Sequence, residues 1–90
     1  MTITRAPAVA GMFYPGRPAV LAATVDQLLA AAPTTEALVP KALIVPHAGY
    51  VYSGSTAAMA YAALAARHAT IRRVVLLGPT HQVAVDGIAV

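Results

Sequence analysis

Two of the three histidines in this sequence, His47 and His81, are the residues best suited to chemistry. Each follows a short apolar run and a proline break, in "LIVPH" and "VVLLGPTH". Imidazole nitrogens bind zinc, copper and iron, and two of them can converge on one ion at about 2.1 Å each. A metal site needs at least a third ligand, and the nearest carboxylate in sequence, Asp86, is explained by a turn. The pattern therefore predicts a two-histidine half-site.

The segments that precede these histidines are expected to be β-strands. Residues 42–45 and 74–77 are uniformly apolar, which is typical of strands buried on both faces. The spacing of 34 residues between His47 and His81 suits a strand-helix-strand unit, whose strands are parallel and whose crossover is right-handed. Parallel strands end at one edge of a sheet, so adjacent or next-but-one strands would bring both histidines there. The predicted fold class is α/β, with a βαβ unit.

A first helix is expected over residues 19–32. Pro18 suits its first turn and Pro33 ends it. The apolar positions at helical spacing are Val20, Leu21, Val25, Leu28, Leu29 and Ala32. Residues 34–41 are expected to form a linker to the first strand.

A second helix is expected over residues 56–68, where alanine dominates. Either Ser53 or Ser55 can cap its start. Arg67 and His68 fall in its last turn, where the helix dipole favours positive charge, so His68 has a structural explanation. Beyond the second strand, residues 83–85 and 88–90 flank Asp86-Gly87, a pair that favours a two-residue hairpin.

Aromatic and glycine residues near the histidines are candidates for a pocket. Gly49 lets the backbone approach a ligand closely, and Tyr50 can donate its hydroxyl into a cavity. Phe13 and Tyr14 lie in a glycine-flanked segment that can fold across the same edge. The predicted pocket-lining residues are Phe13, Tyr14, Gly49 and Tyr50, and no catalytic residue is assigned.

Composition limits the classes of function. The 90 residues carry a net charge of +3, with 59% hydrophobic and only 10% charged residues. The adjacent pair Arg72 and Arg73 does not make the basic stripe of a nucleic-acid face. No apolar run reaches the length of a membrane span, and residues 1–32 lack the layout of a signal peptide. We therefore expect a cytoplasmic protein that binds neither nucleic acid nor membrane.

Three motifs, "AVAGMFYPG", "PHAGYVYSG" and "LLGPTH", together resemble the Memo family, whose bacterial members are called AmmeMemoRadiSam system protein B. The resemblance implies a fold like that of class III non-heme extradiol dioxygenases, with a metal site at the sheet edge. It implies that His47 and His81 are ligands of an iron or copper ion and that Phe13 is the pocket aromatic. Radical-SAM and AMMECR-like proteins are the partners that it suggests.

The family's third ligand is a cysteine near the far end of its domain, and this chain has no cysteine. Residues 1–90 are therefore expected to be a single incomplete Memo-like domain, an N-terminal fragment that self-associates when isolated. Three functions remain open: a dioxygenase-type enzyme, a non-enzymatic module that binds metal or a peptide, and a truncated chain that is inactive alone.

Overall fold

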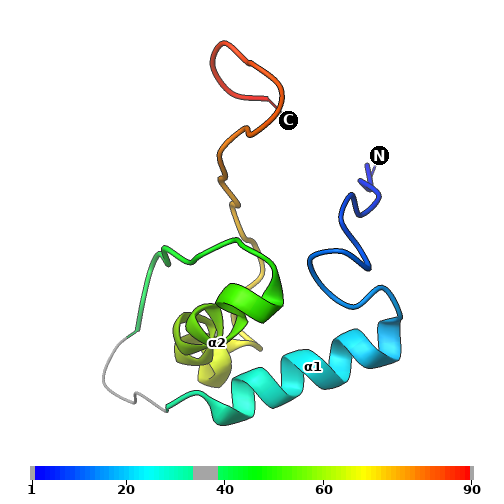
Figure 1. Cartoon of the computed structure of the whole chain (residues 1–90). Coiled ribbons are helices and arrows are strands. Elements are labelled where there is room, and N and C mark those ends of the chain that lie inside the picture. Colours follow the sequence, from blue (N-terminus) through cyan, green and yellow to red (C-terminus); the bar gives the residue numbers. More distant parts are fainter. Residues whose placement is uncertain (1, 34–38, 90) are drawn as a thin grey trace.

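The protein is described by a computed structural model that covers residues 2–33 and 39–89. Its regular elements are the helices α1, Pro18–Ala31, and α2, Tyr50–Tyr61, followed by the 3-10 helix η1, Ala62–Arg67. The helices lie together, and the two ends of the chain extend away from them (Figure 1). No helix in the described part of the chain has the length and apolar character needed to cross a membrane.

Helix α1 confirms the expected element, with bounds that differ by one residue. Pro18 occupies the first turn, where the N–H that proline lacks would have no helical partner, and the helix ends just before Pro33. The expected apolar stripe is only partly covered: Leu21, Val25 and Leu28 are half-buried, whereas Val20 and Leu29 are exposed.

Helix α2 begins earlier than the sequence predicted. It starts at Tyr50, its N-cap is Gly49, and no side chain of the described residues caps it. The expected caps are therefore wrong, because Ser53 and Ser55 lie inside the helix. Continuation through η1 does agree with the alanine-rich pattern. At its end the Nδ1–H of His68 donates to the carbonyl of Ala65 at 2.9 Å, which supports a structural role for His68.

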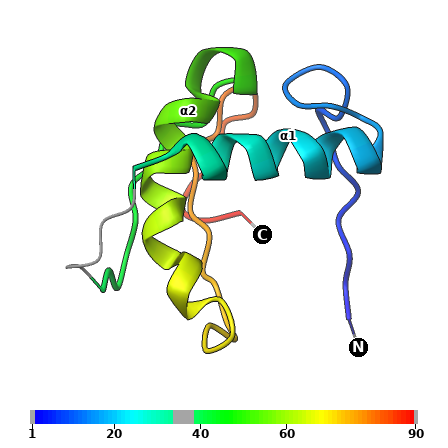
Figure 2. The ribbon, with the colours of Figure 1, turned by 90° about the horizontal axis from the view of Figure 1, so that it is seen from below.

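The two helices are in closest contact at a small residue, Gly54. Gly54 of α2 is buried, and a Cβ built there would lie 3.1 Å from Cδ1 of Leu28 on α1. Figure 2 shows α1 running across α2 rather than alongside it. Ala58, 5% exposed, is the buried hydrophobic residue of the described chain. The core is therefore small, and the close approach at Gly54 is its main packing feature.

We expect Gly54→Val to destabilise the helix pair by about 1–3 kcal/mol, because the added carbons overlap Leu28 in an already close contact. The helical circular dichroism signal at a fixed temperature would report the loss of helix that follows. The matched control is Gly78→Val, since a Cβ at Gly78 meets no described atom within 4 Å. Equal helix content in the two variants would contradict the packing argument.

The predicted parallel strands are not confirmed. Residues 2–33 and 39–89 contain no β-strand, and their one isolated bridge joins Ala10 to Tyr14. Segments 42–45 and 74–77 lack helix or strand structure. Ile44 is 100% exposed and residues 74–77 are all exposed, with Leu76 at 83%, whereas Leu43 and Val45 are half-buried. A strand is stabilised by neighbours that pair with its backbone and cover its faces. Those neighbours are missing among the described residues.

The hairpin predicted around Asp86-Gly87 is also wrong for the residues that the structure describes. Gly87 has a φ of +86°, but no other residue type in the described chain has a positive φ. A type I′ hairpin needs positive φ at both central residues, so Asp86 does not meet that requirement. The segment forms a bend instead. Val90 and most of the predicted linker, residues 34–38, lie outside the described residues.

Candidate functional site

His47 and His81 meet although their segments do not form a sheet. Their Nε2 atoms lie 3.0 Å apart, within hydrogen-bond distance, and their ring planes are tilted by 32°. One ring nitrogen must donate and the other accept, so at most one of the facing atoms carries a hydrogen. Both residues are exposed to solvent. The structure thus brings two imidazoles, side chains of a type that can bind metals, together at an accessible position.

The turn that follows His47 is held in place by hydrogen bonds to backbone carbonyls. The Oγ–H of Ser53 donates to the carbonyl of Ala48 at 2.9 Å, and the backbone N–H of Ser53 donates to Gly49 at 3.0 Å. The N–H of Tyr50 donates to the carbonyl of Phe13 at 2.8 Å. The turn after His47 is therefore attached both to the start of α2 and to the N-terminal loop.

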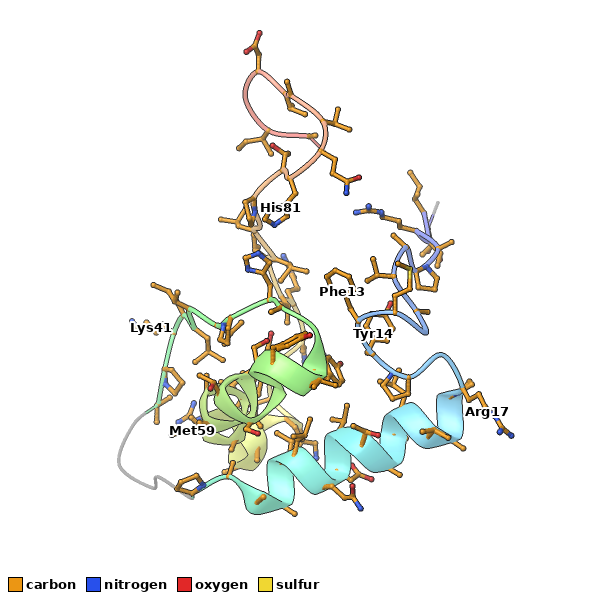
Figure 3. All side chains as sticks on the ribbon, viewed as in Figure 1. Phe13, Tyr14, Arg17, Lys41, Met59 and His81 are labelled. Carbon is orange, nitrogen blue, oxygen red and sulfur yellow. The ribbon has the colours of Figure 1, made fainter. Side chains whose placement is uncertain are left out.

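His81 emerges from a much more open segment. In Figure 3 it lies on the stretch of chain that rises beyond α2, away from the two helices. Residues 71–89 are all exposed. Within the described chain, the contact with His47 is the one hydrogen bond that residues 74–83 make to another segment. The two halves of the histidine pair are thus supported very unequally.

The N-terminal loop brings its aromatic residues to α2. Gly11 has a φ of +83°, which residues other than glycine rarely adopt. Its N–H donates to the backbone carbonyl of Tyr14 at 2.7 Å. The rings of Tyr14 and Tyr50 pack with centroids 5.8 Å apart. Figure 3 shows Phe13 and Tyr14 together on this loop. A tight glycine turn therefore places the Tyr14 ring and the Phe13 backbone against the start of α2.

These aromatics line a shallow, largely apolar depression of about 350 Å³ between the loop and the helices. Its lining residues are Gly11, Met12, Phe13, Tyr14, Pro15, Thr24, Leu28, Tyr50 and Val51. Three of the four predicted pocket residues are among them. Gly49 is not, although a Cβ there would lie 3.4 Å from the Phe13 carbonyl oxygen. Neither histidine lines the depression.

The described residues bring no third ligand to the histidine pair. Among the described residues, no group of three or more histidine, cysteine or acidic side chains is arranged to hold a metal ion. Sequence reasoning also missed the role of Ser53, which it assigned to a helix cap. The signal was its place six residues after His47, close enough for its hydroxyl to turn back to the same loop.

The paired imidazoles define a candidate metal-binding half-site, carried by a turn that joins an extended segment to a helix. The Memo-like protein family matches residues 5–90. The chain belongs to this family, so the resemblance inferred from its motifs is confirmed.

Individual relatives agree. The chain is 48% identical over 77 residues to a MEMO1 family protein of Aquifex aeolicus, a match that covers 86% of this chain and 27% of that protein. It is 39% identical over 85 residues to Protein MEMO1 of Xenopus laevis, covering 94% and 28% respectively. The chain thus spans less than a third of the length of these relatives. No solved structure matches it.

Proposed function

We propose that this chain contributes two histidine ligands, His47 and His81, to the metal site of a Memo-like protein that resembles class III non-heme extradiol dioxygenases. The observation that carries the proposal is the 3.0 Å separation of the two Nε2 atoms. Their segments are 34 residues apart in sequence, so the contact is not a consequence of local chain geometry. Family membership adds support, because the matched residues include both histidine motifs.

The distance fits two neighbouring ligands of one ion. Two nitrogens that each lie about 2.1 Å from an ion and 3.0 Å from each other subtend about 90° at that ion. This is the angle between adjacent positions of an octahedron, the geometry in which two histidines and one anionic ligand leave open positions on iron. An iron or copper ion would supply such open positions for a substrate. The histidines would hold the ion, and their exposure leaves it accessible.

The site needs a further ligand from outside the described residues, which hold no group of three candidate ligands. Relatives are about three times longer than this chain, and a complete Memo-like protein would supply that ligand from its remaining length. Dioxygenase-type turnover belongs to that complete assembly, and this chain alone is expected to bind metal without catalysis.

A second candidate is a non-enzymatic module that acts beside radical-SAM and AMMECR-like proteins. The observation that favours this candidate also weakens the case for an enzyme: two histidines converge without a third ligand in the described chain. In that case the exposed metal ion, or a peptide bound at the same position, would take part in recognising a partner protein. Catalytic oxygen consumption by a complete version of the protein would decide for the enzyme.

Titration of the chain with Cu²⁺, followed by NMR of its histidine side chains, tests the proposal. Paramagnetic broadening should affect His47 and His81 together and saturate near one equivalent, because both rings approach one ion. His68 provides the internal control, since it is not part of the converging pair and would bind Cu²⁺ through a single imidazole. Earlier broadening of His68, or independent broadening of His47 and His81, would reject a shared site.

A further inference from the structure

We infer that Ser53 is the positioning residue of the histidine pair and that its hydroxyl sets the direction in which His47 leaves the backbone. The inference rests on the proposed function, which gives the orientation of His47 its importance. Among the described residues, Ser53 bonds to Ala48 and Gly49 and not to His47, and it is not a candidate ligand of the ion. It therefore acts through the turn that separates it from His47.

The position of Ser53 is unusual for a serine. It is 9% exposed, the buried polar residue of the described chain, and lies in the first turn of α2. A buried hydroxyl is favourable only when it is hydrogen-bonded. Ser53 satisfies this condition by donating from Oγ to the carbonyl of Ala48, the residue directly after His47, at 2.9 Å.

Ser53 also binds the next carbonyl along the chain. Its backbone N–H donates to Gly49 at 3.0 Å, so one residue holds two successive peptide groups. Any side chain at this position could make the backbone bond, but only a hydroxyl or a similar group can make the bond to Ala48. Removing the hydroxyl therefore frees the peptide group next to His47 while the helix keeps its own hydrogen bonds.

This support matters because His81 has so little of its own. Segment 74–83 is exposed, and in the described chain its hydrogen bond to another segment is the one between the histidines. If His47 changes its orientation, no other hydrogen bond to a separate segment of the described chain keeps His81 beside it. The geometry of the pair is then set from the His47 side, through Ser53.

The test compares Ser53→Ala with Ser55→Ala in the complete 90-residue chain, using Zn²⁺ alone and a competing chromogenic chelator. Ser55 lies on the same helix, is exposed, and makes no side-chain hydrogen bond among the described residues. We expect Ser53→Ala to weaken Zn²⁺ binding about 3- to 10-fold, less than the roughly 10- to 100-fold typical of groups bonded directly to a metal ligand. Ser55→Ala should bind as the unmodified chain does, and Ser53→Thr, which keeps the hydroxyl, should restore affinity.

A readout without metal separates positioning from folding. In the metal-free chain, Ser53→Ala should shift the imidazole nitrogen signals of His47 and His81 but not those of His68, with helix content equal to that of Ser55→Ala. Alanine favours helix more than serine does, so α2 is expected to persist. Loss of helix content along with affinity would overturn the inference, because Ser53 would then support the helix instead.

His47→Ala separates a failure of the proposed metal half-site from a failure of the positioning role of Ser53. If it binds Zn²⁺ as tightly as the unmodified chain, the proposed function fails and the inference fails with it. If His47→Ala loses binding while Ser53→Ala matches Ser55→Ala, the half-site stands and only the role of Ser53 is rejected.

Discussion

His47→Ala and His81→Ala should each lower the affinity for copper or iron by more than about 100-fold, above the range for groups that only support a ligand. The two Nε2 atoms are 3.0 Å apart, so each variant leaves a single imidazole where two had converged. Metal content after dialysis, measured by mass spectrometry, and direct titration would both report the loss.

The matched control is His68→Ala, which removes the remaining histidine and should leave metal content unchanged. His68 bonds to Ala65 at the end of η1, remote in sequence from both histidine motifs. The double variant of His47 and His81 should be no worse than either single variant, because one lost ligand already destroys the chelate. Undiminished metal content in either single variant would show that the pair is not a metal site.

The isolated 90-residue chain should self-associate and unfold without a sharp transition. Its described core contains one buried hydrophobic side chain, Ala58, whereas the four consecutive residues 74–77 are exposed and apolar. Apolar surface of this kind tends to pair with other chains when nothing within the chain covers it. Sedimentation velocity and thermal unfolding would measure both properties.

Negative charges placed within residues 74–77 should reduce the self-association of the chain. We expect the double variant Val75→Glu and Leu77→Glu to shift the sedimentation profile toward monomer, because glutamate disfavours burial against another chain. Ile3→Glu is the control, since Ile3 is an exposed apolar residue outside this segment. A monomer with a cooperative transition for the unmodified chain would show that its small core suffices.

The elements with local causes could be predicted from the sequence. Helix α1 follows from the apolar spacing between Pro18 and Pro33, and both prolines act through their own backbone geometry. The alanine-rich stretch gives helix because alanine loses no side-chain freedom there. The start of α2 could not be predicted in the same way: "GYVYSG" has weak local preference, and the Tyr50 N–H is satisfied by Phe13, far away in sequence.

The predicted strands were not confirmed, for a reason that lies outside the local sequence. Residues 42–45 and 74–77 have the composition of buried strands, but strand structure depends on backbone partners and covered faces. In the described residues those partners are absent: residues 74–77 are exposed, and segment 42–45 is at most half-buried. The sequence proposed Phe13, Tyr14 and Tyr50 as pocket residues, but it gave no sign that Thr24 and Leu28 of α1 line the same depression.

The sequence by itself determined the two helical regions, the family, and the identity of the candidate ligands, because these depend on local propensity and on motifs read along the chain. Only the tertiary structure decided that His47 and His81 lie 3.0 Å apart without a sheet between them, and that Ser53 holds the turn beside one of them. Both contacts join residues whose separation in space depends on the whole path of the chain, and no local preference encodes that path.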